Sequence, residues 1–202
     1  MSARWKESVR TVAFMVVLSL VSITSVSALH LATAQRVNRN ADLYLQRAVM
    51  EVADVTVPAD AAAVSRWFAE SVEAEPAGAP TRFRVRDAVT RDTVALAFKC
   101  RGRGLWGTIT AVVGMAPDGR TFRQLRILDQ NETPGLGARI GEPWFMRQTA
   151  GKRGPLKLVP EGTRSAQPNE IDAVTGATIS SAAVRDMLNR LLDEAPFKEA
   201  AP

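Results

Sequence analysis

An apolar run near the N-terminus, from Thr11 to Ala34, constrains the fold of this chain more than any other feature. The run contains no Asp, Glu, Lys or Arg. As a helix it would be about 36 Å long, which exceeds the roughly 30 Å hydrocarbon core of a bilayer. We therefore expect a single transmembrane helix followed by a domain outside the bilayer.

A cleaved signal peptide is the alternative for this run, because the tripeptides VSA and ATA resemble cleavage sites. The apolar core of a signal usually has about 7–15 residues, fewer than this run, so we favour a retained anchor. Both alternatives predict an exported domain. A small excess of basic residues before the run favours a cytoplasmic N-terminus, with the domain on the periplasmic side of the inner membrane. The basic residues are Arg4, Lys6 and Arg10 before the run, and Arg36 and Arg39 after it.

Three serines recur at a spacing of three within the run, at Ser19, Ser22 and Ser25. Small residues let a second membrane helix approach closely, which would dock the anchor into a larger complex. Alternatively, each hydroxyl bonds back to its own helix and faces lipid. The sequence leaves both interpretations open.

Composition argues against several classes of function. The net charge is +5, but Lys and Arg are scattered and aromatic residues make up only 6% of the chain. We therefore expect no nucleic-acid binding. Cys100 is the only cysteine, which excludes an internal disulfide and a cysteine-based metal cluster. With His30 as the only histidine, we expect no metal site and no His-based catalytic triad.

The pattern beyond the anchor predicts an α+β fold, with an antiparallel sheet and helices packed on it. The expected helices are 36–55 (beginning near Asn40 or Asp42), 60–74, 142–149 and 180–192. The expected strands are 81–89, 92–100, 105–115, 121–129 and 155–159, with a hairpin turn at Pro117–Gly119. We expect four segments: tip and anchor (1–35), helical connector (36–79, ending in a turn or linker at 75–80), domain (80–195) and tail (196–202).

The stretch NETPGLGARIGEPW, residues 131–144, is the first candidate site. Its glycines Gly135 and Gly137 flank Leu136. Glycines let backbone N–H groups come close to a flat or anionic ligand. A tight connection between a strand and a helix explains the same composition.

The stretch DAVTGATISSAAV, residues 172–184, is the second candidate site, because it carries more hydroxyls than a helix cap needs. One cap contributes about 1 kcal/mol and uses one hydroxyl. A helix N-terminus also binds anions, and Gly176 would let the backbone approach a phosphate. A hydroxyl there is well placed to be esterified by that phosphate. The apolar face of the expected helix comprises Ile179, Val184, Met187, Leu188, Leu191 and Leu192.

Three stretches of the sequence resemble signatures of one family. They are GRGLWGTI (102–109), ETPGLG (132–137) and DAVTGAT (172–178). The family comprises FMN-binding subunits, including NqrC of the Na⁺-translocating NADH:quinone oxidoreductase (NQR) and RnfG of the Rnf complex. The first stretch is more similar to the NqrC type.

The resemblance implies that FMN is attached through its phosphate to Thr178. It implies cofactor-binding roles for further residues of the two loops: Asp172, Thr175, Gly176, Ala177, Glu132, Thr133 and Leu136. Gln130 stands where family members often have histidine, so no proton relay is expected there. The implied partners are other membrane subunits of an Rnf- or NQR-type complex and a separate flavin transferase.

No pair of residues typical of acid–base or nucleophilic catalysis is evident, so we expect an electron-carrying subunit and not a complete enzyme. Two alternatives remain. The exported domain is a binding or structural module without flavin, or it is a stand-alone flavoprotein that serves another partner.

Overall fold

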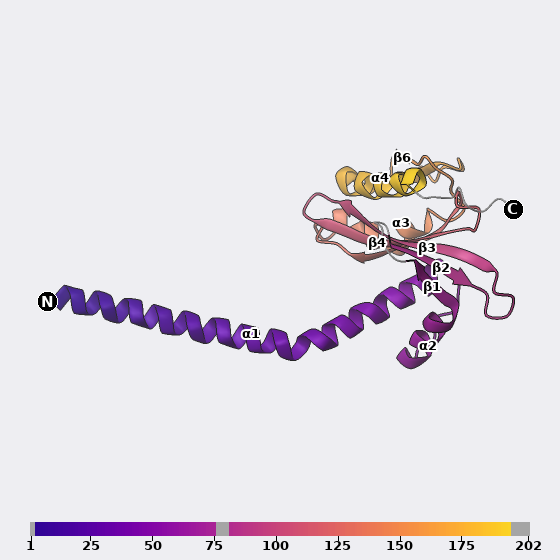
Figure 1. Cartoon of the computed structure of the whole chain (residues 1–202). Helices are drawn as coiled ribbons and strands as arrows, with labels where there is room; N and C mark the ends of the chain where they lie inside the picture. The colour runs from indigo at the N-terminus through magenta and orange to yellow at the C-terminus, as the bar shows by residue number, and fades with distance from the viewer. Residues whose placement is uncertain (1–2, 76–80, 195–202) are drawn as a thin grey trace. The chain divides into compact units, whose positions relative to one another are not determined.

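The computed structural model describes residues 3–75 and 81–194 (Figure 1). Most of the expected linker 75–80 and all of the expected tail 196–202 lie outside the described residues. The chain divides into two compact units, Met1–Asp42 and Leu43–Pro202.

The first unit consists of the long helix α1 (Ala3–Val52) up to Asp42. Its large apolar side chains from Val12 to Leu31 are each more than half exposed. The helix is long and apolar enough to cross a membrane, and a membrane is the environment that would cover such side chains. The hydroxyls of Ser22 and Ser25 donate to carbonyl oxygens four residues earlier, at 2.9 and 2.8 Å. These two serines therefore satisfy their hydroxyls within their own helix.

Helix α1 is continuous through Asn40 and Asp42, so the expected new helix start at these residues is wrong. Its last turns, from Leu43 to Val52, belong to the second unit. Helix α2 (Ala61–Ser71) follows, and the Asp60 carboxylate caps it by accepting from the Ala63 N–H at 2.9 Å.

The second unit contains a five-stranded antiparallel sheet in the order β1-β2-β3-β4-β5, which confirms the α+β prediction. Its strands are β1 (Val72–Glu75), β2 (Thr81–Arg86), β3 (Thr93–Arg103), β4 (Thr108–Met115) and β5 (Phe122–Asp129). The predicted hairpin joins β4 to β5. Asp118 holds its turn by accepting from the Arg120 and Thr121 N–H groups, and Gly119 adopts a positive φ of 62°.

Strand β1 was not predicted. The helix expected to run to Ala74 ends at Ser71, and residues 72–75 pair with β2. Glutamates of β1 face arginines of β2, with Glu75 to Arg84 at 2.7 Å and Glu73 to Arg86 at 2.5 Å. These opposite-charge pairs across neighbouring strands favour the strand over another helical turn.

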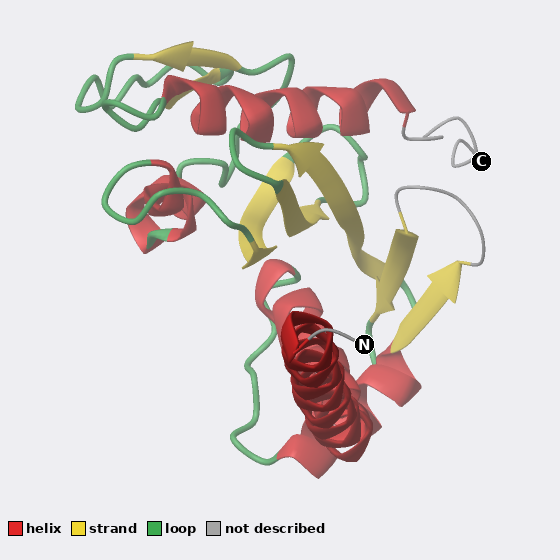
Figure 2. Ribbon diagram, turned by 90° about the vertical axis from the view of Figure 1, so that its left-hand side faces the viewer, coloured by secondary structure: helices red, strands yellow, loops and turns green. Residues whose placement is uncertain are grey.

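Helices cover both faces of the sheet (Figure 2). The end of α1 and helix α2 pack on one face, with Val49 and Val52 against Val85 and Val112. On the other face lie η1 (Gly137–Gly141), α3 (Pro143–Arg147) and α4 (Thr178–Glu194). A short parallel pair, β6 (Lys157–Val159) and β7 (Glu170–Asp172), accompanies α4, and β7 was not predicted.

Candidate functional site

A cavity of about 320 Å³ lies where the 132–137 loop meets the start of α4. It brings together Glu132, Thr133 and Leu136 from the first stretch with Gly176, Ala177 and Thr178 from the second. The remaining lining residues are Leu105, Gly137, Ile179 and Ser180. Two stretches that are about 40 residues apart in the sequence thus form a single site.

The N-terminus of α4 opens on this cavity. Thr178 is the first helical residue, and its side chain is exposed. The N–H groups of the first helical turn have no acceptor within the helix, which gives this end a preference for anions. Gly176 precedes the turn with a positive φ of 75°, and a Cβ there would lie 3.1 Å from Leu136 Cδ2. Glycine therefore permits the close contact between the two loops.

The side-chain hydroxyls of Thr178, Ser180 and Ser181, at the start of α4, differ in their hydrogen bonds. Ser181 donates to the Ala177 carbonyl and accepts from the Val174 N–H, at 3.0 and 2.9 Å. Ser180 donates to the Glu132 carboxylate. Ala177, directly before the helix, has no polar side chain, so the expected hydroxyl cap is not used. Among the hydrogen bonds of the described residues, none involves the Thr178 hydroxyl, which is left facing solvent.

Glu132 lies on the floor of the cavity with a 4% exposed side chain. Its Oε1 accepts from the backbone N–H of Trp106 at 3.0 Å, and its Oε2 accepts from the Ser180 hydroxyl. The Gln130 side chain accepts from the Glu132 N–H at 2.6 Å. Gln130, which stands where family members often have histidine, thus orders the loop that carries Glu132.

Three large apolar side chains that line the cavity are exposed, and so is that of Trp106, the residue after Leu105. Leu105, Trp106, Leu136 and Ile179 are 53%, 69%, 45% and 58% exposed. The expected place of Ile179 on the buried face of the helix is therefore wrong. A rim of this kind is typical of a surface that a planar apolar ligand or a partner covers.

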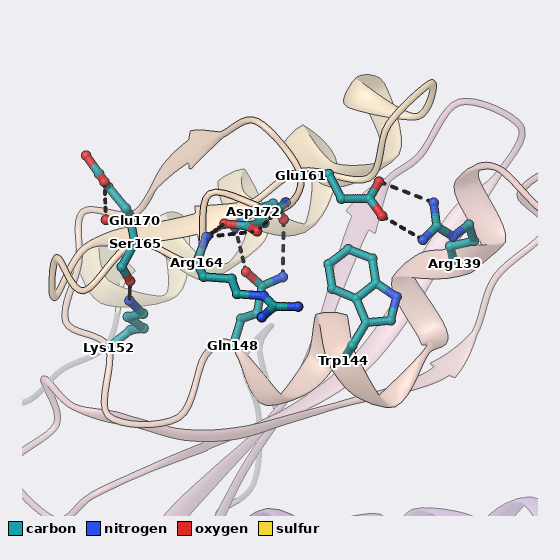
Figure 3. Close-up of a pocket in the computed structure, with 10 residues that line it drawn as sticks. Arg139, Trp144, Gln148, Lys152, Glu161, Arg164, Ser165, Glu170 and Asp172 are labelled. Atoms are coloured by element: carbon teal, nitrogen blue, oxygen red, sulfur yellow. Dashed lines mark hydrogen bonds and ion pairs between the residues drawn. The ribbon is translucent and has the colours of Figure 1, made fainter.

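Asp172 lies in a different cavity, of about 480 Å³, which Trp144 and Lys152 also line (Figure 3). The Asp172 carboxylate is 5% exposed and accepts from the N–H groups of Gly162 and Arg164, at 2.7 and 3.1 Å. The Gln148 side-chain amide donates to the Asp172 carbonyl oxygen and accepts from the Asp172 N–H. Asp172 thus orders the 162–164 loop, and the structure does not bring its carboxylate to Thr178.

An ion pair links the two site loops from outside the cavity. Arg139 donates to both carboxylate oxygens of Glu161 at 3.3 and 2.8 Å, and Glu161 accepts from the Thr175 N–H at 2.7 Å. The Arg139 guanidinium, together with the Thr175 N–H, lowers the pKa of Glu161 from 4.5 to about 2. Glu161 therefore holds Thr175 at the edge of the site.

Sequence reasoning singled out Gly137 but did not identify Leu105, Ile179 and Ser180 as individual site residues. Ser180 gives a usable signal, because it is a polar residue at a buried position of an amphipathic helix. Within residues 3–75 and 81–194, no cluster of His, Cys, Asp and Glu could hold a metal ion.

The family model of the FMN-binding domain matches residues 104–193, the part of the chain that contains this cavity. Curated relatives include NqrC of the Na⁺-translocating NADH-quinone reductase from Neisseria meningitidis, which is 37% identical over 90 residues. That alignment covers 42% of this chain and 35% of the relative. NqrC of Yersinia pestis is 34% identical over 103 residues, covering 48% of this chain and 39% of the relative. The chain thus matches little more than a third of the length of these relatives.

Two solved structures share the fold. NqrC of Shewanella oneidensis aligns with a TM-score of 0.65 and 22% identity, covering 72% of this chain and 88% of that chain. NqrC of Parabacteroides distasonis aligns with a TM-score of 0.67 and 22% identity, covering 82% and 96%.

The second unit therefore has the fold of the two NqrC structures, and it contains the residues that match the FMN-binding domain model. Residues 104–193 are similar to the FMN-binding domain, and the chain resembles NqrC proteins over 90 to 103 residues.

Proposed function

We propose that this chain is a membrane-anchored electron-transfer subunit of an NQR-type complex, and that its FMN is joined by a phosphoester to Thr178. The observation that carries the proposal is the position of Thr178. It is an exposed hydroxyl on the first turn of α4, at a cavity built from both family stretches. The NqrC relatives, together with the GRGLWGTI stretch, favour the NQR type over the Rnf type.

The residues at the site fit an FMN phosphate. A phosphodiester keeps one negative charge, and the N–H groups of the first turn of α4 stabilise it. The new bond joins the Thr178 oxygen to the phosphorus, with the loss of one water relative to free FMN. No acid or base among the described residues is hydrogen-bonded to the Thr178 hydroxyl, so we infer that a separate flavin transferase makes the bond.

The cavity and its rim fit the flavin ring. A cavity of about 320 Å³ is near the lower end of the range for ligand sites. The exposed side chains of Leu105 and Leu136 line it and offer apolar surface to the ring. Bound FMN supplies the electron-transfer chemistry. The chain holds the cofactor and sets the electrostatics around it.

The apolar helix explains why a covalent bond is useful. With the N-terminus in the cytoplasm and the domain outside, a dissociated cofactor would be lost from the cell. The covalent bond keeps the flavin on the anchored chain, beside the other membrane subunits with which we propose it assembles.

The chain purified from its natural host tests the proposal on a denaturing gel under ultraviolet light. We expect a fluorescent band for wild type and none for Thr178→Ala. Thr108→Ala, which removes another exposed threonine hydroxyl from the same domain, should keep the fluorescence. A dark wild-type band would favour a binding module without flavin. Purification of a flavinylated chain without polytopic subunits would favour a stand-alone flavoprotein.

A further inference from the structure

The buried carboxylate of Glu132 connects its own loop to two other segments of the chain. It accepts hydrogen bonds from the Trp106 backbone and from the Ser180 hydroxyl. Trp106 belongs to the β3–β4 connection and Ser180 to the first turn of α4. The Glu132 side chain therefore joins the loop of the exposed tryptophan to the helix that begins with Thr178.

Two glycines make room for this carboxylate. A Cβ at Gly104 would lie 2.4 Å from Glu132 Oε1. A Cβ at Gly137 would lie 2.5 Å from the Ser180 oxygen and 2.8 Å from Glu132 Oε2. Real Cβ atoms do not approach other atoms so closely, so any larger residue at either position would displace the carboxylate.

Stability alone does not explain a buried charge at this place. A well-packed apolar side chain is often at least as stabilising as a buried ionic group. Both carboxylate oxygens have a hydrogen-bond partner, Oε1 in the Trp106 N–H and Oε2 in the Ser180 hydroxyl. The carboxylate also lies on the floor of the cavity that Thr178 borders. A fixed negative charge there acts directly on whatever the cavity holds.

We propose that Glu132 is a positioning residue that clamps the Trp106 loop to the start of α4, and that its negative charge lowers the reduction potential of the flavin. This inference rests on the proposed function, since it concerns the FMN at Thr178. Adding an electron beside a fixed negative charge is unfavourable, and water in an open site would screen that charge more than a partly closed cavity does. Glu132→Gln removes the charge with little change of shape, so it should raise the potential.

The test uses the full chain in detergent, from a host that attaches flavin, with fluorinated tryptophan incorporated. We compare wild type with Glu132→Gln and with Ser180→Ala, which removes one arm of the clamp and keeps the charge. The control Glu70→Gln removes an exposed charge from α2, on the opposite face of the sheet. Redox titration gives the potential, and Trp106→Phe assigns the fluorine resonance of Trp106.

We expect both clamp variants to shift or broaden the Trp106 resonance, and only Glu132→Gln to raise the potential clearly. The control should change neither. An unchanged Trp106 resonance in both clamp variants would overturn the clamp, and an unchanged potential in Glu132→Gln would overturn the role of the charge. Intact mass separates this inference from the proposed function. A wild-type chain without flavin would refute the function and with it the potential claim, whereas the Trp106 resonance would still decide the clamp.

Discussion

The two faces of the five-stranded sheet are packed in different ways. Most of the buried side chains on the face under α1 and α2 are Ala and Val, such as Ala48, Val49, Val52 and Val85, with Phe83 as the exception. The other face carries a larger apolar cluster. Apart from Ser71, the buried polar residues of the described chain all lie with the elements on that second face. One face therefore packs against the end of α1, and the other builds the candidate cofactor site.

Gly114→Ala, on the sheet face that packs against α1, is expected to have the largest effect on stability. A Cβ at Gly114 would lie 2.1 Å from the Val52 carbonyl oxygen, and backbone cannot yield as a flexible side chain can. We expect a loss of about 3 kcal/mol in the free energy of unfolding, with FMN still attached. Chemical denaturation and intact mass measure the two quantities.

Gly141→Ala is the control, because a Cβ there meets nothing within 4 Å. Its stability should be unchanged or slightly higher. A Gly114→Ala chain as stable as this control would show that the end of α1 is not packed on the sheet as described.

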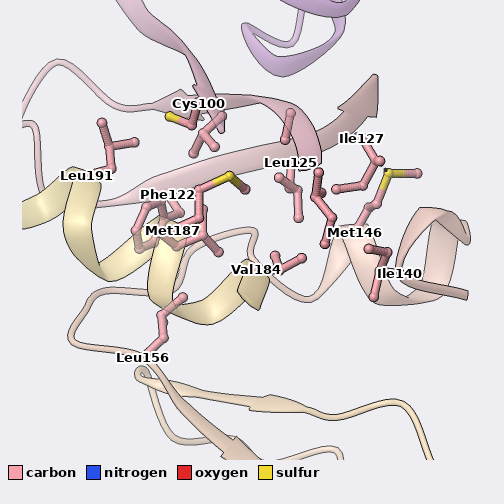
Figure 4. Packing of buried hydrophobic residues seen from close by; sticks show 14 of the residues in the cluster. Cys100, Phe122, Leu125, Ile127, Ile140, Met146, Leu156, Val184, Met187 and Leu191 are labelled. Carbon is pink, nitrogen blue, oxygen red and sulfur yellow. Dashed lines mark hydrogen bonds between the residues drawn. The ribbon is translucent and has the colours of Figure 1, made fainter. Parts of the chain in front are cut away.

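A matched pair of substitutions compares the faces directly. Val49 on α1 and Val184 on α4 are both completely buried (Figure 4 shows Val184 in the α4 cluster). Replacing either by alanine removes two buried methyl groups and should cost roughly 2 kcal/mol of stability. Only Val184→Ala should also lower the fraction of chains that carry FMN, because it loosens the helix that begins at Thr178. Equal flavin content in both variants would contradict the division of roles between the faces.

The smallest effect is expected from the Arg139–Glu161 ion pair at the edge of the candidate site. Because the pKa of Glu161 is lowered in the folded chain, its pairing with Arg139 stabilises the fold fully above about pH 4.5. The contribution is lost as the pH falls toward about 2. We expect Arg139→Gln to unfold at a lower temperature than wild type at neutral pH, and this difference to shrink through that window.

Arg147→Gln, an exposed arginine on α3, serves as the control and should show no such window. A constant difference between wild type and Arg139→Gln at all pH values would rule out the Glu161 pair as its cause.

Local patterns predicted much of the fold. Alternating apolar residues predicted β2 to β5, and Pro117–Gly119 predicted the turn of the hairpin. Strand β1 was missed because residues 60–74 have a helical composition, and its pairing with β2 is decided by cross-strand contacts. Strand β7 was missed because it has only 3 residues and pairs with β6 in parallel.

The sequence motifs predicted which residues of the two loops would come together at the candidate site. Thr178, Gly176, Leu136 and Glu132 meet at one cavity, as the resemblance implied. The motif could not reveal that the Asp172 side chain turns to another cavity, since the direction of a side chain depends on β7 and the 162–164 loop. Likewise, the partnership of Ser180 with Glu132 spans 48 residues and follows from packing.

Fragmentation of one tryptic peptide tests the central claim most directly. Cleavage after Arg164 and Arg185 releases residues 165–185, which contain Thr175, Thr178 and both serines of the α4 start. In protein from the natural host, we predict that every fragment containing Thr178 carries the mass of FMN less one water. Fragments ending at Ala177 or beginning at Ile179 should be unmodified. An unmodified peptide, or a flavin located on any other side chain, would contradict the account.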